Sequence, residues 1–401
     1  MLPVRFLVQH PQEQCYSQLR HGRMEKQIEY YPLRVIISGG GTGGHIFPAI
    51  AIADALKKAA PETEILFVGA QGRMEMERVP QAGYEIKGLP VKGFDRKHIW
   101  KNFSVLKTLI KSRYMAREII RQFAPDIVVG VGGYASAPTL KEAQQMRLPT
   151  LLQEQNSYAG VTNKLLGKNA QCICVAYPNM ERFFPAEKIV MTGNPIRPIL
   201  ENSSIDQAEA LLYFGFETQN EPNTATTLLI IGGSLGAKTI NESVIRALPQ
   251  WQKENIRLIW QTGKSYIDTA QKQLQELGFK DAYVAPFIDR MELAYAAADL
   301  VVSRAGASSI SELCLLAKPS ILIPSPNVAE DHQTKNAQAL SSRGAAVLIP
   351  DSSAPGMLAD EVSELIHNSE RLRAMGQAAY QLAGHNATQT IVDEIYKLLK
   401  K

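Results

Sequence analysis

The chain repeats one pattern twice, in which short apolar runs alternate with stretches of helical periodicity. In the first series the apolar runs lie at 33–38, 64–69, 126–133, 149–155, 171–176 and 188–194. Continuous Val, Ile and Leu runs are typical of strands buried on both faces, as in parallel sheets flanked by helices. After a polar stretch at 217–227 the series starts again. We therefore predict an α/β fold of two consecutive doubly wound, Rossmann-like units.

The length of 401 residues agrees with two units, because single cores rarely grow beyond about 250–300 residues. We place the first unit at 33–198 and the second at 199–385, after an N-terminal extension at 1–32. Ligands of such sheets bind beyond the carboxyl ends of the strands. If the two units face each other, the turns that follow their strands line one cleft.

The composition of the chain excludes several classes of protein. The formal net charge of +4 is too small to indicate binding of nucleic acid. No run of 18 apolar residues is present, so we predict no membrane-spanning helix. Four scattered cysteines form no disulfide framework, as in a reduced cytoplasmic protein. Cys172 and Cys174 share a strand face; without a second Cys or His pair nearby, we interpret them as core thiols rather than a metal pair.

A Gly-rich turn follows the first predicted strand. Gly39, Gly41 and Gly44 match G-x-G-x-x-G ahead of a helical pattern. Glycines let a ligand approach the backbone, and a helix N-terminus favours an anion. A dinucleotide site also needs an acidic residue at the end of the second strand. That strand ends in Gly-Ala-Gln at 69–71, which argues against NAD.

His45 closes this turn and opens the helix. A histidine at a helix start often does no more than bond a carbonyl group. Here, however, the imidazole is expected to project into the cleft beside Gly-rich backbone, and a helix N-terminus disfavours the charged ring. We interpret His45 as a neutral base.

The Gly-rich turn of the second unit, at 232–237, carries Ser234. Its hydroxyl is placed to bind a phosphate oxygen together with the amides of the following helix. A simple N-cap is the alternative interpretation, and the two roles are compatible.

A later turn of the second unit, at 303–313, brings the fixed cation of Arg304 and small residues such as Ala307, which permit close approach of a ligand to the backbone. Ser308, Ser309 and Glu312 enter the next helix. Glu312 is suited to accept hydrogen bonds from two ribose hydroxyls. Ser309 and Glu312 also fit a capping box, which is the structural alternative.

Further turns add polar side chains at strand ends. Gln333 and Asn336 lie three residues apart on one predicted helix face, which suits sugar hydroxyls, although an amphipathic surface helix has the same pattern. In the first unit, Glu154 and Asn156 follow a strand and are expected to face the cleft. The turn at 130–138 is the remaining candidate.

Seven of these segments, in this order, resemble the motifs of the MurG family. They are GGGTGGHIFPA, GGYASAP, EQNSYAGVTNK, TGNPIR, GGSLGAKTIN, SRAGASSISEL and AEDHQTKNA. The members are UDP-N-acetylglucosamine:undecaprenyl-pyrophosphoryl-N-acetylmuramoyl-pentapeptide N-acetylglucosaminyltransferases. The resemblance runs from about Leu33 to the C-terminus and implies the two-domain GT-B fold. It also implies that the C-terminal helix at 386–401 crosses back onto the first domain.

The resemblance implies that the second domain holds the donor, UDP-N-acetylglucosamine. Ser234 would bind phosphate, the backbone of Ile288 would meet the uracil, and Gln333 and Asn336 would hold the sugar. Together with the turns above, the expected donor set is Thr42, Gly43, Gly44, Asn156, Arg197, Ser234, Ile288, Arg304, Ala307, Ser308, Ser309, Glu312, Gln333 and Asn336.

The transfer implied by the resemblance is inverting and metal-independent, and we expect no cofactor. The 4-hydroxyl of the lipid-linked muramoyl-pentapeptide acceptor would attack the donor carbon opposite UDP. His45 matches the family's candidate base, and Glu154 is the reserve. Gly41, Tyr134 and Ser136 are assigned to the acceptor. The chain departs from many relatives at Gln153, where they have histidine.

A basic segment at 87–121 holds ten Lys and Arg residues against Asp95 and Glu118, interleaved with apolar residues. It is either an ordinary solvated helix face or a patch that docks on anionic lipid headgroups. A lipid-linked acceptor favours docking, at the cytoplasmic face of the bacterial plasma membrane. Association with other cell-wall enzymes is a further expectation.

Three alternatives remain open. One is another GT-B enzyme acting on UDP-sugars, such as a glycolipid glycosyltransferase or a UDP-N-acetylglucosamine 2-epimerase. Another is a dehydrogenase that uses the first Gly-rich turn. The third is a non-catalytic nucleotide-binding protein of a cell-envelope complex, which would need neither His45 nor the turns of the first unit.

Overall fold

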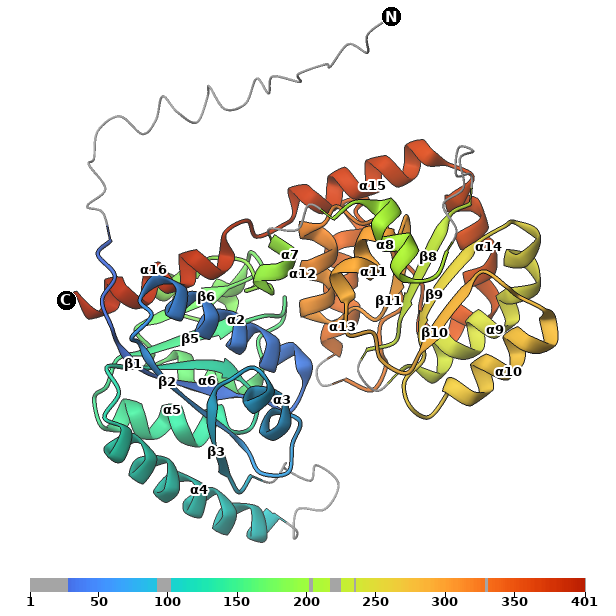
Figure 1. Cartoon of the computed structure of the whole chain (residues 1–401). Coiled ribbons are helices and arrows are strands. Elements are labelled where there is room, and N and C mark those ends of the chain that lie inside the picture. The colour runs from blue at the N-terminus through green and yellow to red at the C-terminus, as the bar shows by residue number, and fades with distance from the viewer. Residues whose placement is uncertain are drawn as a thin grey trace, which may run out of the picture.

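The computed structural model describes residues 28–91, 102–201, 205–216, 225–233, 236–328 and 331–400. Within these ranges the chain forms two parallel sheets, each surrounded by helices (Figure 1). In β1, Val35 and Ile37 pack into one core cluster, whereas Ile36 packs into another. Successive residues thus enter cores on opposite faces, which explains why the strands read as continuous apolar runs.

The first sheet contains β1 (Arg34–Gly39), β2 (Glu64–Ala70), β3 (Glu85–Leu89), β4 (Ile127–Gly132), β5 (Thr150–Glu154), β6 (Cys172–Val175) and β7 (Ile189–Met191). Its helices are α2 (Gly43–Ala59), α3 (Glu75–Gln81), α4 (Asn102–Phe123), α5 (Ser136–Gln145) and α6 (Val161–Gly167), with the short 3-10 helices η2 (Met180–Arg182) and η3 (Ala186–Lys188).

The second sheet contains β8 (Thr227–Ile231), β9 (Arg257–Gln261), β10 (Ala282–Ala285), β11 (Leu300–Ser303), β12 (Ser320–Leu322) and β13 (Val347–Leu348). Its helices are α7 (Pro198–Glu201), α8 (Gln207–Tyr213), α9 (Lys238–Lys253), α10 (Ile267–Leu277), α11 (Met291–Ala297), α12 (Ala307–Leu315), α13 (His332–Ser341), η5 (Asp351–Ser353), α14 (Ala354–Ile366) and α15 (Ser369–Gln381).

The strand order places one switch point in each sheet. The first sheet runs β3-β2-β1-β4-β5-β6-β7 and the second runs β10-β9-β8-β11-β12-β13. The order reverses between β1 and β4, and again between β8 and β11. At such a point the connecting turns diverge and leave a crevice at the carboxyl ends of the strands. The Gly-rich turns after β1 and β8 therefore lie at the two expected binding crevices.

The chain crosses between the two halves twice (Figure 1). The first crossing runs through 192–197 into α7, and the second joins α15 to α16 (Ala387–Leu399). Ile391 and Tyr396 of α16 are fully buried in the core beneath the first sheet. The hydroxyl of Tyr396 also donates to the carbonyl of Tyr31, 2.7 Å away, so the start of the described chain packs on α16.

The predicted α/β architecture is confirmed, with one strand that the sequence reading missed. All the predicted apolar runs form strands of the expected sheets. The missed strand is β3, at the edge of the first sheet, where burial alternates and only Leu89 is fully enclosed. An edge strand lacks the continuous apolar run on which the prediction rested.

Candidate active site

The turn between β1 and α2 places His45 in the first helical turn. Thr42 is the N-cap residue, with an extended backbone and no side-chain cap bond. Its Oγ1 lies 3.2 Å from Nδ1 of His45, which fixes the orientation of the ring. The other edge of the ring faces Gly132 at the end of β4, where an added Cβ would lie 3.0 Å from Nε2. Glycine at 132 thus makes room for the imidazole at the switch point.

The surroundings of His45 keep the imidazole neutral. The pKa of His45 is lowered to about 4, mainly by burial and next by His332 of α13, against a smaller opposing contribution from a hydrogen bond with the backbone of Gly40. His332 belongs to the second domain, so both domains contribute to the electrostatics of this ring. A neutral imidazole can accept a proton, as the sequence interpretation requires.

Glu75 of α3 holds the first Gly-rich turn in place. This carboxylate is almost fully buried. It accepts hydrogen bonds from the backbone N–H of Gly41, at 2.9 Å, and of Ala70, at 3.0 Å. An added Cβ at Gly40 would collide with it, 2.2 Å from Oε1. Glu75 therefore ties the end of β2 to the turn after β1, a role that the sequence reading did not identify.

Glu154, at the end of β5, organises the loop that follows it. Its Oε1 accepts from the backbone and side-chain nitrogens of Asn156, at 3.1 and 3.2 Å. Its Oε2 accepts from the backbone of Gly160 and from Asn163 Nδ2, at 3.1 and 3.0 Å. Burial raises the pKa of Glu154, and these four hydrogen bonds oppose the rise. Since its oxygens are engaged within the loop, His45 is the better placed of the two candidate bases.

Asn336 joins this loop to the second domain. Its Oδ1 accepts from both the backbone and the hydroxyl of Ser157, at 3.1 and 2.9 Å. Its Nδ2 donates to Asn156 Oδ1 at 3.3 Å. Asn336 is fully buried. Asn156 and Asn336, both expected at the donor, are thus brought together from the two domains.

Arg197 and Glu312 form a second contact between the domains. Nε and Nη2 of Arg197 donate to Oε1 of Glu312, at 3.1 and 2.9 Å. The other oxygen of Glu312 accepts from the hydroxyl of Tyr295, 2.9 Å away. Burial, and next the carboxylate of Glu312, raise the pKa of Tyr295, so its hydroxyl stays protonated as a donor. Tyr295 therefore fixes the carboxylate that was expected to bind ribose.

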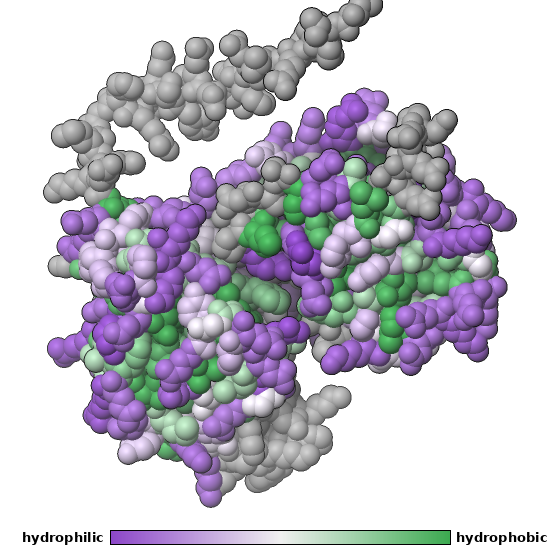
Figure 2. Space-filling view, in the orientation of Figure 1, coloured by the Kyte–Doolittle hydropathy of each residue, from purple (hydrophilic) through white to green (hydrophobic). Residues whose placement is uncertain are grey.

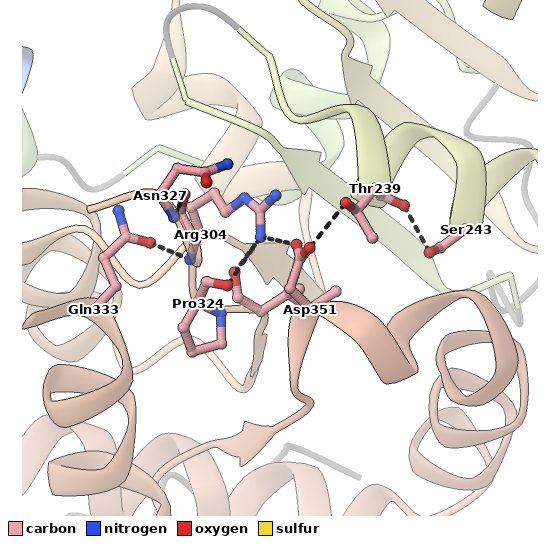
Figure 3. Close-up of polar contacts among 9 residues, drawn as sticks. Thr239, Ser243, Arg304, Pro324, Asn327, Gln333 and Asp351 are labelled. Carbon is pink, nitrogen blue, oxygen red and sulfur yellow. Dashed lines mark hydrogen bonds and ion pairs between the residues drawn. The ribbon is translucent and has the colours of Figure 1, made fainter. Parts of the chain in front are cut away.

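Arg304 braces the turns at the carboxyl edge of the second sheet. Its Nη1 donates to the carbonyls of Ile323 and Pro324, at 3.0 and 3.1 Å, and pairs with Asp351 of η5. The other oxygen of Asp351 accepts from Thr239 Oγ1 of α9, 2.9 Å away. Figure 3 shows the guanidinium directed between Pro324 and Asp351, with Thr239 beyond the carboxylate. This mostly buried pair holds three turns around the expected phosphate site.

The start of α12 rules out the capping-box interpretation. The helix begins at Ala307, and Gly306 is the N-cap residue, so Ser309 already lies inside the first turn. Ala307 is buried, and the hydroxyl of Ser308 is enclosed with no hydrogen-bond partner. Ser309 is half-buried. The small residues before Glu312 thus leave an uncapped helix N-terminus at the switch point.

The other predicted donor residues lie near this edge. The backbone N–H of Ile288 donates to Gln261 Oε1, at 3.0 Å. The side-chain nitrogen of Gln261 donates to the carbonyl of Gly233, also at 3.0 Å. Gln333 is half-buried and its Oε1 accepts from the backbone of Ser325, at 2.8 Å (Figure 3). Ser234 lies outside the described residues.

The predicted acceptor residues differ in exposure. Gly41 is exposed, and Tyr134 is 59% exposed. Ser136 is fully buried, and its hydroxyl donates to the carbonyls of Ser38 and Gly132, at 2.6 and 3.0 Å. Its side chain therefore joins the ends of β1 and β4 and does not face solvent.

Four residues that position the site were not predicted from the sequence: Glu75, Gln261, Tyr295 and Asp351. Only Asp351 shows the pattern from which the other site residues were predicted, namely a polar residue shortly after a strand. Glu75 and Tyr295 lie within helices, and Gln261 ends a buried strand. Nothing in the local pattern distinguishes them from ordinary helix or strand residues.

In the described part of the chain, no group of three or more His, Cys, Asp or Glu side chains is arranged to hold a metal ion. Cys172 and Cys174 are buried, with their sulfurs 3.9 Å apart. None of the described helices is long and apolar enough to span a membrane.

Similarity to known proteins agrees with this architecture. Residues 35–175 match the Glycosyltransferase family 28 N-terminal domain, and residues 227–394 match the C-terminal domain of that family. A UDP-N-acetylglucosamine--N-acetylmuramyl-(pentapeptide) pyrophosphoryl-undecaprenol N-acetylglucosamine transferase of Porphyromonas gingivalis is 58% identical over 92% of this chain and 96% of its own length. The protein of the same name from Parabacteroides distasonis is 55% identical over 92% of this chain and 99% of its own.

Solved structures show the same arrangement. The crystal structure of Acinetobacter baumannii MurG has a TM-score of 0.72 and 29% identity, and covers 91% of this chain and 100% of its own. A UDP-GlcNAc 2-epimerase from Neisseria meningitidis, with a TM-score of 0.63 and 16% identity over 91% of this chain and 100% of its own, shares the fold. The predicted GT-B fold is confirmed. The chain belongs to glycosyltransferase family 28, within its MurG branch.

Proposed function

We propose that this enzyme transfers N-acetylglucosamine from UDP to the 4-hydroxyl of undecaprenyl-pyrophosphoryl-N-acetylmuramoyl-pentapeptide, with inversion at the sugar carbon. The observation that carries the proposal is the 58% identity to a transferase of that name over nearly its whole length. The site geometry supports it, because a neutral imidazole and several hydrogen-bonding side chains from both domains lie at the carboxyl ends of the strands.

The reaction is a single displacement. The acceptor oxygen forms a bond to C1 of the donor while the bond from C1 to the β-phosphate oxygen breaks. The proton of the acceptor hydroxyl passes to the neutral ring of His45, and UDP leaves with the bonding electrons. A positioned general base contributes about 10²–10⁴-fold to rate.

A pKa of about 4 makes His45 a weak base before substrates bind. Two pyrophosphate groups enter the cleft, one on the donor and one on the acceptor. Their negative charges favour the protonated ring and raise its pKa toward the working pH. Substrate binding thus activates the base, and the free enzyme keeps it neutral.

The donor is held mainly by the second domain. Glu312, fixed by Tyr295, binds the ribose, and Gln333 and Asn336 bind the sugar. The uncapped N-terminus of α12, and that of α9, face the phosphates and stabilise the leaving UDP without a metal ion. Since Asn336 and Glu312 are engaged by Ser157 and Arg197, donor hydroxyls must replace these partners, and the domains must adjust as the donor binds.

The acceptor enters from the first domain beside the membrane. On α4, Leu109, Ile110 and Tyr114 are exposed at 39, 64 and 67%. Lys107 and Lys111 are exposed on the same helix. In contrast, Arg113 pairs with the buried Glu142 of α5, at 2.6 Å, and so anchors the helix. We assign the exposed face of α4 to peripheral contact with anionic lipid at the cytoplasmic face of the membrane; residues 92–101 of the predicted patch lie outside the described ranges.

The deciding test measures UDP release from UDP-N-acetylglucosamine with and without the lipid-linked acceptor, in EDTA. Acceptor-dependent release that survives EDTA supports both the reaction and its metal independence. Acceptor-dependent release of UDP that is abolished by EDTA supports the proposed reaction but refutes its metal-free mechanism. No release with this acceptor, together with epimerisation of the UDP-sugar, would point to a 2-epimerase instead.

A further inference from the structure

A second cavity, which we call the hinge cavity, lies where the two chain crossings meet. It has a volume of about 570 Å³, and Gly193 of the first crossing and Gly384 of the second both line it. The crossings touch there, since a Cβ added at Gly193 would lie 2.6 Å from Cα of Gly384. None of the residues that we assign to donor, acceptor or catalysis lines this cavity. The hinge cavity is therefore distinct from the proposed substrate site. Figure 2 shows a hollow in the surface between the two halves.

The charge around the hinge cavity has one sign. Among its described lining residues, Arg182 comes from η2, Lys335 from α13 and Arg343 from the turn after α13. No Asp or Glu is present in that lining. Arg182 and Arg343, one from each domain, favour a negatively charged occupant.

Two of these cations are held in position on the wall. Nη2 of Arg182 donates to the carbonyl of Ser157, at 2.8 Å, which leaves the other donors of its guanidinium for further bonds. The ammonium of Lys335 lies 3.6 Å from the centre of the Tyr158 ring. Such contacts lower the entropy that the side chains lose when they bind an anion.

Part of the remaining wall is apolar and aromatic, and polar side chains such as Asn194 and Gln338 form the rest. Tyr177 follows β6, Ile310 and Cys314 come from α12, and Leu340 comes from α13. A volume in the range of about 300–1,000 Å³ is typical of sites for small organic molecules. The cavity therefore combines a cationic rim with surface suited to a ring or short hydrocarbon.

We propose that the hinge cavity binds a small organic phosphate monoester, with the phosphate on Arg182 and Arg343 and the apolar part against Tyr177 and Leu340. Each guanidinium can make paired hydrogen bonds to a phosphate, which an ammonium cannot.

Occupation of this cavity restricts the domains. Its walls come from both halves, and Ser157 in its lining bonds to Asn336 of the donor site. Asn194, also in the lining, donates to Ser311 Oγ of α12 at 2.9 Å. A ligand bound in the hinge cavity opposes the change of hydrogen-bond partner at Asn336 that donor binding requires. It therefore raises the KM for UDP-N-acetylglucosamine, and excess donor relieves the inhibition because the two ligands favour different positions of Asn336; this regulatory part rests on the proposed function.

Binding is tested by calorimetric titration of the full chain with phenyl phosphate, with phenol and inorganic phosphate as partial probes. Phenyl phosphate binds one site, phenol alone does not, and inorganic phosphate binds more weakly. The variant Arg182→Gln/Arg343→Gln weakens binding by about tenfold or more for each lost guanidinium. The control Lys253→Gln/Lys272→Gln loses the same charge from exposed helix positions and leaves binding unchanged.

A competition experiment with UDP distinguishes binding of phenyl phosphate in the hinge cavity from binding at the donor site. Saturating UDP leaves the affinity for phenyl phosphate within about threefold, whereas full displacement by UDP would place the probe in the cleft and overturn the proposal. Equal binding by the double variant would also overturn it. Binding without inhibition refutes the regulatory part alone. An inactive chain that still binds phenyl phosphate through Arg182 and Arg343 refutes the proposed function and leaves the site standing.

Discussion

Arg197, in the crossing between the domains, donates two hydrogen bonds to a single oxygen of Glu312, in the middle of α12. The other oxygen of that carboxylate is held by Tyr295. A residue expected to bind the donor ribose is therefore also a contact that joins the two halves. Donor binding and domain position are coupled at one carboxylate.

Replacing Glu312 by Gln weakens donor binding. An amide keeps the shape but loses the charge and one acceptor, and hydrogen bonds to charged groups contribute about 1.5–3 kcal/mol. The KM for UDP-N-acetylglucosamine rises by about ten- to a hundredfold, with a smaller change in kcat. Steady-state kinetics check this. Tyr295→Phe has a smaller effect in the same direction; an unchanged KM in both variants would show that Glu312 serves only the domain contact.

Replacing His45 by Ala removes the base. The expected loss in kcat is about 10²–10⁴-fold, with donor affinity retained, because the ring acts on the acceptor proton. Acceptor-dependent UDP release gives kcat, and calorimetry gives the donor affinity. His367→Ala, at an exposed position near the end of α14, is the matched control. Full activity of His45→Ala would remove the assignment.

The protonation of His45 depends on the substrates. Its pKa of about 4 in the free enzyme means that the ring stays neutral as the pH falls from about 8 to 5.5. Its imidazole NMR signals, assigned by comparison with His45→Ala, are therefore constant over that range. Saturating UDP brings negative charge to the cleft and raises the pKa of His45, so that the ring titrates within this pH range. The substitution His332→Gln removes the electrostatic effect of that ring on His45 and so also raises the pKa of His45. If His45 of the free wild-type enzyme titrated near pH 6.5, neither burial nor His332 would be lowering its pKa.

Replacing Asp351 by Asn loosens the turns that Arg304 braces. The guanidinium keeps its two carbonyl partners but loses its mostly buried counter-charge. A cost of about 1–3 kcal/mol lowers the thermal midpoint by several degrees, and the KM for the donor rises. Calorimetry and kinetics are compared with Asp206→Asn, an exposed carboxylate of the same domain. A stable variant with normal KM would show that Thr239 and the carbonyls suffice.

Replacing Ile110 by Glu weakens attachment to membranes. The side chain is 64% exposed on the basic helix α4, and a carboxylate there is both polar and repelled by anionic lipid. Co-sedimentation with vesicles that contain an anionic phospholipid falls several-fold. Leu212→Glu, 60% exposed on α8 of the second domain, retains wild-type sedimentation. Equal losses in the two variants would mean that overall charge, and not the α4 face, governs binding.

Much of the fold was readable because it depends on local patterns. Continuous apolar runs predicted both sheets, and the turns after strands predicted that His45 and Glu312 lie in the helices that follow β1 and β11. The edge strand β3 was missed since its burial alternates. The capping-box alternative at Ser309 was wrong because α12 begins two residues earlier, at Ala307.

The sequence by itself determined which residue types follow each strand, and the order of motifs that defines the family. Tertiary structure decided which of these side chains meet. Glu75 lies in a helix, yet it secures the turn after β1 because parallel strands bring the ends of β1 and β2 to the same edge. Asn156 and Asn336 are 180 positions apart and bond only because two separately folded domains face each other. Such contacts have no periodicity along the chain, since they depend on how the domains pack.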